Sequence, residues 1–158
     1  MPLSTPSPQP DNNPKNNESG NNASKWTFEE DHRLVKSWIN VSTNPLTRVD
    51  QKKYGFWTKV AHAFNQATPS DATKKPPKTL NSRWNRAAPL VLKWCGCVAK
   101  VYREMPSGTN EDDTLQNAHN LYEIKMEKKF NLMHWWYLLQ DQPKWESACD
   151  QSLESSSK

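Results

Sequence analysis

Tryptophan is the residue that most constrains how this chain folds. All eight tryptophans lie between Lys25 and Trp145, together with all four phenylalanines and all four tyrosines. Large aromatic side chains are largely buried in folded proteins. A segment of about 120 residues can enclose them in one core without disulfides or metals. We therefore expect a single folded domain over residues 25–145.

The two ends of the chain have a different composition. Residues 1–24 contain five prolines and no aromatic residue, and residues 146–158 end in a serine-rich polar run. Such segments bury too little apolar surface to offset the entropy lost on ordering. The sequence therefore predicts a disordered N-terminal tail over 1–24 and a disordered C-terminal tail over 146–158.

Three features favour a nuclear or cytosolic protein that makes no membrane contact. No stretch approaches the roughly 18 apolar residues of a membrane span. The N-terminus lacks the basic start and apolar run of a secretory signal. Cys95, Cys97 and Cys149 are odd in number and two of them are close neighbours, which is a poor disulfide framework and fits a reducing compartment.

Apolar periodicity predicts helices and no sheet. A first helix begins at a capping box formed by Thr27 and Glu30 and ends before Asn44-Pro45. A second runs roughly over 50–66, and a third starts near Thr79 as its N-cap. The side chains expected to face inward from these helices are Leu34, Val35, Trp38, Ile39, Trp57, Val60, Ala61, Phe64, Leu80, Trp84, Ala87, Ala88 and Val91.

Two further helices are expected in the C-terminal third. One is capped by Thr109 with Asp112, and a short one ends at the stretch 141–143. Their inward side chains are Leu115, Ala118, Leu121, Tyr122, Leu132, Trp135, Trp136 and Leu139, whereas Tyr137 faces outward. Pro89 falls within the third helix, so it kinks that helix or ends it and opens a new one.

Basic residues gather between Lys74 and Arg103. The window holds eight of them and no Asp or Glu, whereas acidic residues cluster at 29–31 and 111–113, where helix starts favour them. Ordinary solvated helix faces mix both signs. The asymmetry therefore favours a surface that binds a polyanion.

The third helix has a polar strip opposite its tryptophan. With Trp84 at the centre of the buried face and about 100° per residue, Ser82 and Arg86 point away and Arg83 and Asn85 flank them. Arg suits guanine, Asn suits adenine and Ser suits either, while lysines before the helix suit phosphates. The candidate DNA-binding residues are Ser82, Arg83, Asn85, Arg86, Lys74, Lys75, Lys78 and Lys93.

Three short strings carry a family resemblance: KWTFEED at 25–31, FWTKVA at 56–61 and LNSRW at 80–84. They resemble the helix signatures of a Myb or SANT repeat. These strings are spaced more widely than in a standard Myb repeat, and the chain also contains WINVSTNP at 38–45 and KKFNLMHWWYLLQDQPKW at 128–145. In both respects it resembles plant trihelix-related Myb/SANT-like proteins, which often carry a no-apical-meristem-associated region. Such proteins tend to carry Asn and a polar or basic residue where this chain has Ala88 and Pro89.

The resemblance implies an all-α, three-helix, homeodomain-like helix-turn-helix core with added C-terminal helices. Trp26, Trp38, Trp57 and Trp84 are its expected core tryptophans. It implies a nuclear transcription regulator that binds double-stranded DNA, with the helix at about 79–88 in the major groove. The alternative is a SANT-type protein-interaction module that acts as a chromatin or transcription adaptor.

Catalytic and metal sites are not expected. Cys95 and Cys97 form only a C-x-C pair, and Cys95 is expected to be a buried thiol. The four histidines are scattered without a Cys or Asp partner motif. We therefore expect no enzyme activity, no cofactor, no metal and no small-molecule substrate. The string KKPPK at 74–78 fits either a loop or a nuclear import signal.

Overall fold

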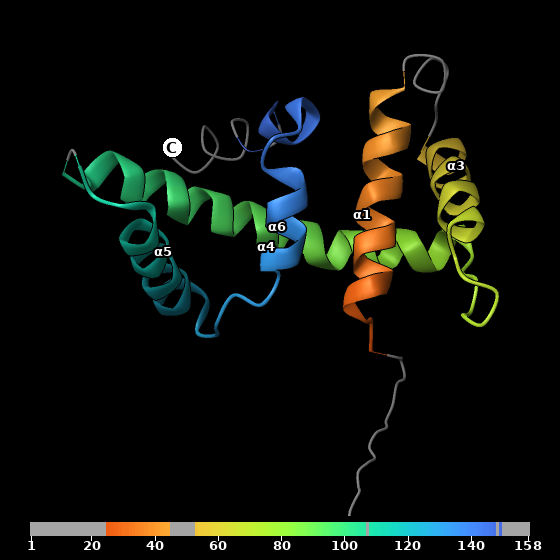
Figure 1. Cartoon of the computed structure of the whole chain (residues 1–158), viewed down its shortest axis with the longest axis horizontal. Helices are drawn as coiled ribbons and strands as arrows, with labels where there is room; N and C mark the ends of the chain where they lie inside the picture. The colour runs from red at the N-terminus through yellow and green to blue at the C-terminus, as the bar shows by residue number, and fades with distance from the viewer. Residues whose placement is uncertain (1–24, 45–52, 107, 148, 150–158) are drawn as a thin grey trace, which may run out of the picture.

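The structure, a computed structural model, describes residues 25–44, 53–106, 108–147 and 149, and within these ranges it is all-α (Figure 1). Its labelled helices are α1 (Phe28–Thr43), α3 (Lys53–Gln66), α4 (Pro77–Glu104), α5 (Glu111–Met126) and α6 (Met133–Leu139). A further helical turn covers 143–147. The predicted all-α class is confirmed, and the predicted tail at 1–24 lies outside the described residues. Among the described helices, none has the length and apolar character to cross a bilayer.

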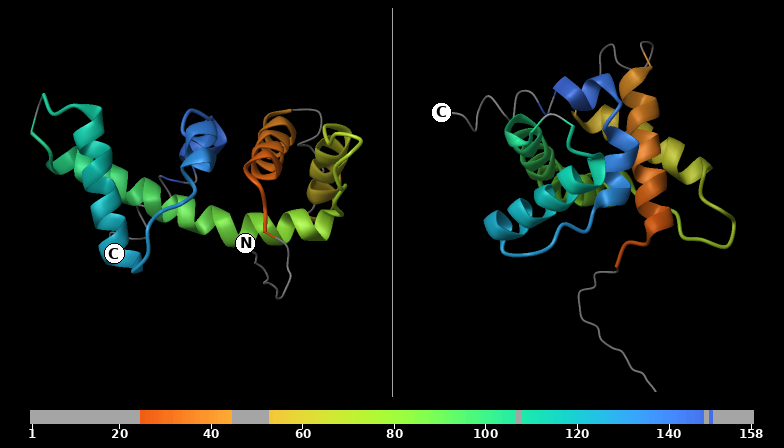
Figure 2. Two further views of the ribbon diagram at one scale, coloured as in Figure 1. Left: turned by 60° about the horizontal axis from the view of Figure 1, so that its bottom comes forward. Right: turned by 60° about the vertical axis from the view of Figure 1, so that its left-hand side comes forward.

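The long helix α4 organises the molecule. It runs across most of the width of the view in Figure 1. Helices α1 and α3 pack together near its N-terminal half, α5 packs on its C-terminal half, and α6 lies between them against α1. Figure 2 shows α1, α3 and α6 on the same side of α4. One side of α4 is therefore turned away from these helices.

One continuous apolar core joins the helices. The predicted inward residues of α3 are all buried, as are Leu34 and Val35 of α1 and the four predicted residues of the last helix. Burial of each Val, Leu or Phe side chain among them stabilises the fold by about 1.5–3 kcal/mol before entropy is counted. The largest fully buried side chains are Trp94, Trp135, Tyr122 and Phe64.

Helix α1 starts as its sequence predicts. The Thr27 side chain accepts a hydrogen bond from the Glu30 backbone N–H at 3.1 Å, and the Glu30 carboxylate accepts one from the Thr27 N–H at 3.1 Å. This reciprocal pair satisfies two backbone donors that have no partner within the helix. The helix ends at Thr43 with Asn44 as its C-cap.

Two predicted caps are wrong by one to three residues. Helix α4 begins at Pro77, with Pro76 rather than Thr79 as N-cap, because proline at the first helical position has a suitable φ and needs no backbone donor. The N-cap of α5 is Asn110, whose side chain accepts from the Asp113 N–H at 2.8 Å. The Thr109 hydroxyl instead donates to the Pro106 carbonyl at 2.7 Å.

Pro89 does not end its helix. Helix α4 is continuous over 28 residues with Pro89 inside it, so the expectation that a new helix opens at this proline is wrong. Proline removes the hydrogen bond to the carbonyl four residues earlier, that of Asn85. Asn85 and Pro89 are both exposed, so water can reach this side of the helix and hydrate the freed carbonyl.

The C-terminal helical turn extends past residue 145, the predicted end of the folded domain. Residues 143–147 are helical and Trp145 is buried. The ordered part of the chain thus extends past residue 145, after which the sequence predicts a disordered tail. Trp145 explains the extension, since its ring contacts Trp38 and Trp84 at centroid distances of 6.5 and 6.4 Å.

Candidate nucleic-acid interface

The solvent-facing side of α4 carries a continuous polar and basic stripe. At about 100° per residue, its members fall within an arc of about 100°. All are exposed: Lys78, Ser82, Asn85, Arg86, Pro89 and Lys93. We call these residues the α4 stripe. As predicted, Ser82 and Arg86 point away from the core, and Leu80, Ala87, Ala88 and Val91 are buried on the opposite side.

The loop before α4 is held close to α3. The Asn65 amide donates to the Lys75 carbonyl at 2.8 Å, and its oxygen accepts from the Lys75 N–H at 2.8 Å. This two-point contact fixes the backbone on which Lys74 lies, and the Lys74 side chain is exposed. Lys74 therefore extends the basic surface beyond the N-terminal end of the stripe.

Two of the predicted DNA-binding residues form ion pairs within the protein. The Lys75 ammonium lies 3.4 Å from the Glu30 carboxylate and 4.9 Å from the centre of the Trp26 ring. The Arg83 guanidinium binds Asp31, with Nε–Oδ1 at 2.9 Å and Nη2–Oδ2 at 2.7 Å. A DNA contact would have to break these pairs, so we assign both side chains a structural role.

Asp31 is the centre of a buried polar network that sequence reasoning missed. Its side chain is 2% exposed, and its Oδ2 also lies 2.9 Å from Nε2 of His134 on α6. A buried carboxylate is tolerated only when it is paired and hydrogen-bonded. The prediction that Asp31 is a helix-start acid is confirmed, since Asp31 lies in the first turn of α1. The sequence shows no partner motif for His134, because Arg83 and His134 lie 52 and 103 positions from Asp31.

A cluster of tryptophans supports α4 from behind. The Trp84 ring stacks on Trp38 with centroids 4.6 Å apart and also contacts Trp57 at 6.1 Å and Trp135 at 5.1 Å. Of the four predicted core tryptophans, Trp57 is buried, whereas the other three are half-buried and pack against the core. Trp26 lies before α1 rather than within it and contacts the edge of Phe64.

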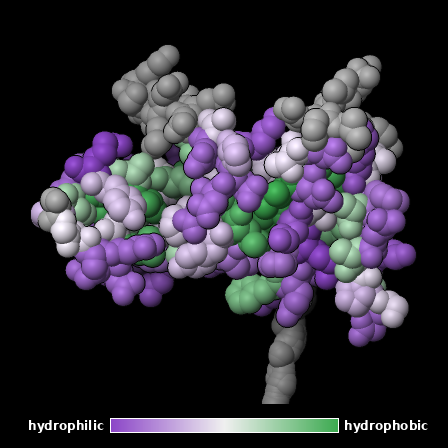
Figure 3. All heavy atoms as spheres, turned by 45° about the horizontal axis from the view of Figure 1, so that its top comes forward, coloured by the Kyte–Doolittle hydropathy of each residue, from purple (hydrophilic) through white to green (hydrophobic). Residues whose placement is uncertain are grey.

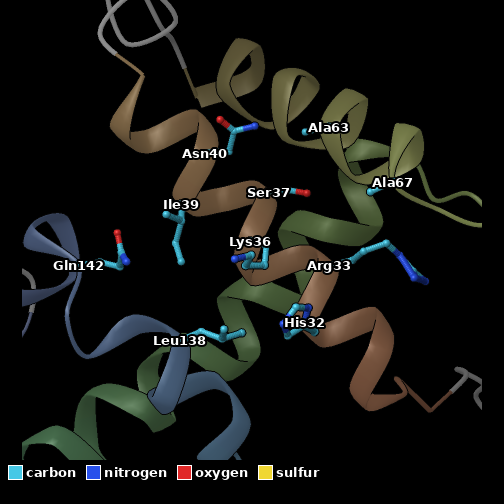
Figure 4. A pocket seen from close by; sticks show the side chains of 10 residues that line it. All are labelled: His32, Arg33, Lys36, Ser37, Ile39, Asn40, Ala63, Ala67, Leu138 and Gln142. Carbon is cyan, nitrogen blue, oxygen red and sulfur yellow. The ribbon is translucent and has the colours of Figure 1, made fainter.

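A second surface lies on the face that α1 shares with α3 and α6. A groove of about 560 Å³ is lined by His32, Arg33, Lys36, Ser37, Ile39, Asn40, Ala63, Ala67, Leu138 and Gln142 (Figure 4). Figure 3 shows hydrophobic surface between hydrophilic side chains on the face of α1 and α6. The groove thus combines apolar and basic side chains. The buried Nε–H of Arg33 has no hydrogen-bond partner among the described residues.

The cysteines differ from the expected arrangement. Cys95, predicted to be buried, is half-buried, and Cys97 is the buried thiol of the pair. Burial raises the pKa of Cys97, and the nearby Lys125 and Lys93 partly oppose that rise. Within the described residues, no three His, Cys, Asp or Glu side chains gather as a metal site requires.

Comparison with known proteins gives two related plant sequences. The chain is 31% identical over 122 residues to glutathione S-transferase T3 from Arabidopsis thaliana, covering 77% of this chain and 21% of that protein. It is 31% identical over 127 residues to glutathione S-transferase T2 from the same plant, covering 78% and 22%. The chain spans about a fifth of the length of these curated relatives. No protein-family model and no solved structure matches it.

Proposed function

We propose that this chain binds double-stranded DNA and regulates transcription in the nucleus, with the first half of the α4 stripe in the major groove. In this proposal α1, α3 and α4 form a Myb/SANT-like helix-turn-helix unit. The observation that carries the proposal is the α4 stripe itself: an exposed row of Lys, Arg, Asn and Ser side chains in a window of eight basic and no acidic residues.

The chemistry of the stripe matches what duplex DNA presents. Arg86 and Asn85 are exposed and adjacent, and these side-chain types can bond guanine and adenine edges in the major groove. Lys74, Lys78 and Lys93 are also exposed and can contact phosphates, which fixes orientation without reading sequence. The ion pair of Arg83 with Asp31 and the Trp84 stack hold α4 in the rotation that presents these groups.

We further propose that the chain acts by binding and not as an enzyme. The transferase activity in the names of the two relatives concerns proteins of which this chain spans about a fifth. His134 and Asp31 form a histidine–carboxylate contact, but Arg83 occupies both oxygens of that carboxylate. The Phe28 ring also lies 4.4 Å from the His134 ring. These contacts favour a structural role.

Selection from a pool of random-sequence DNA duplexes tests the proposal. Enrichment of one short motif by the wild-type protein, with loss of that enrichment in Arg86→Ala, is the expected result. The matched control is Lys128→Ala, which removes an exposed positive charge from the segment between α5 and α6 and should keep the enrichment. Recovery of unselected sequences by both the wild type and this control would overturn sequence-specific DNA binding.

The groove in Figure 4 favours a second candidate function, a protein-interaction module. It is lined by the basic side chains of His32, Arg33 and Lys36 and by the apolar side chains of Ile39 and Leu138. This combination suits an amphipathic helix with acidic residues. Binding of a synthetic acidic amphipathic peptide, weakened by Lys36→Glu and unaffected by Arg86→Glu, would support this candidate. Equal binding of the peptide by both variants would exclude this groove as its site.

A further inference from the structure

Two thiols that are far apart in the sequence meet beside the C-terminal helical turn. Cys95 of α4 and Cys149 both line a cavity of about 430 Å³, together with Trp136, Gln140, Trp145 and Glu146. Both cysteines are half-buried and neither is in a disulfide. The two side chains are joined by a thiol–thiol hydrogen bond. The sulfurs are therefore neighbours in a space that small molecules can enter.

The surroundings of Cys95 favour its thiolate. The Trp145 indole N–H donates a hydrogen bond to the Cys95 sulfur at 3.4 Å. The hydrogen bond from Cys149 does most to lower the pKa of Cys95 below its ordinary value, burial opposes it, and the Trp145 and Trp136 side chains add to the lowering. Thiolates are the reactive form of cysteine, so we assign the attacking role to Cys95.

We propose that Cys95 and Cys149 form a reversible intramolecular disulfide when the protein meets a peroxide. The site is a modification site whose substrate class is a small hydroperoxide and whose resolving group is Cys149. It is independent of the proposed DNA binding, because neither cysteine belongs to the α4 stripe. In reducing compartments such disulfides are typically transient and redox-sensing.

The reaction balances with one peroxide molecule. The Cys95 thiolate attacks one peroxide oxygen, the O–O bond breaks, and Cys95 becomes a sulfenic acid while the second oxygen leaves and takes a proton. The Cys149 sulfur then attacks the sulfenic sulfur, and the S–O bond breaks with loss of water. With hydrogen peroxide, two thiols are oxidised to one disulfide and the peroxide is reduced to two waters.

The disulfide would fasten the C-terminal turn to α4. Cys149 follows Trp145, whose ring contacts Trp38 and Trp84. Closing a loop of roughly 50 residues removes entropy from the unfolded chain, and its expected effect on a domain of this size is a rise in Tm on the order of 10 °C. Oxidation would thereby stabilise the tryptophan cluster behind α4.

Treatment of the full chain with hydrogen peroxide, followed by non-reducing proteolysis and mass spectrometry, tests the proposal. We expect a peptide pair that links Cys95 to Cys149, with the two hydrogen atoms of the thiols lost. We also expect a higher Tm that dithiothreitol reverses. Cys149→Ser and Cys95→Ser should lose both effects and should remain helical by circular dichroism.

Cys97→Ser is the matched control. Cys97 lies two residues after Cys95 on the same helix, about 200° around it, and its thiol is buried with a raised pKa. This variant should form the disulfide as the wild type does. A Cys95–Cys97 link, a disulfide between two molecules, over-oxidised Cys95 without a link to Cys149, or unreacted thiols in folded protein would each overturn the proposal.

Discussion

The Arg83 guanidinium forms a two-point ion pair with the buried carboxylate of Asp31, at 2.9 and 2.7 Å. This contact joins α4 to the first turn of α1, and His134 of α6 binds the same carboxylate at 2.9 Å. One side chain thus connects three helices. Since Arg83 lies between Ser82 and Asn85 in the sequence, the pair also sets the rotation of α4 that turns the α4 stripe outward.

Removal of one member of this pair should destabilise the domain strongly. Arg83→Ala leaves the Asp31 carboxylate buried with only His134 as a partner, and breaking a buried pair typically costs about 3–5 kcal/mol. We expect a loss of about 3 kcal/mol in the free energy of unfolding, measured by urea denaturation. Arg86→Ala, an exposed arginine one turn further on, should change it by less than about 0.5 kcal/mol. Equal losses in the two variants would contradict the assigned roles.

Trp84→Ala should also destabilise the domain, by about 3–5 kcal/mol. The ring is half-buried but contacts Trp38, Trp57, Trp135 and Trp145, so its removal leaves a cavity where several helical segments meet. Thermal or urea unfolding followed by circular dichroism measures the loss. Ser82→Ala on the opposite side of α4 is the matched control. An unchanged Tm for Trp84→Ala would show that the cluster contributes little.

The sequence predicts local features of this fold well because their causes are local. The Thr27–Glu30 capping box needs only residues three positions apart, and the inward face of α3 follows from helical spacing alone. Contacts between distant segments have no such signal. Nothing in the sequence pairs Asp31 with Arg83 or His134, so helical spacing alone assigns Arg83 to the DNA surface, although its charge is used within the fold.

Pro89→Ala should stabilise α4. The helix is continuous through Pro89, and an interior proline costs up to about 3 kcal/mol relative to alanine. Because Pro89 lies on the exposed side, where water can hydrate the Asn85 carbonyl, we expect a gain of about 1–3 kcal/mol in the free energy of unfolding. Comparison of the urea midpoints of the wild type and Pro89→Ala measures this gain in stability. A loss of stability would mean that the proline is needed where it stands.

His119 should make stability depend on pH. Burial lowers the pKa of His119 below its ordinary value of 6.5, and its ring lies 4.4 Å from that of Trp94. The unfolded chain therefore binds more protons than the folded one below about pH 6.5, so stability is lost as pH falls through this range. The wild type should have a lower urea midpoint at about pH 5.5 than at about pH 7.5, and this difference should become smaller in His119→Gln. A His119→Gln protein that keeps the wild-type difference between the two pH values would contradict this assignment.

The candidate site follows from the sequence in part. Helical periodicity is sufficient to place Ser82, Asn85 and Arg86 outward, since a wheel centred on Trp84 fixes the opposite face. It is not sufficient for Lys75 or Arg83, because an acidic partner on α1 becomes visible only once the helices are packed. The thiol pair has no sequence signal for the same reason, as Cys149 reaches Cys95 only through the turn that carries Trp145.

The salt dependence of binding to a selected DNA duplex tests the central claim most directly, when the wild type, Arg86→Ala and Lys78→Ala are compared. If the α4 stripe binds DNA, log K for the wild type should fall linearly with log salt, by about 0.9 per phosphate neutralised. Lys78→Ala should lower that slope by about one and weaken all sequences alike. Arg86→Ala should cost about 1–3 kcal/mol on the selected duplex and much less on a scrambled one. A wild-type slope near zero, or Arg86→Ala affinities equal to those of the wild type on both duplexes, would contradict DNA binding by the α4 stripe.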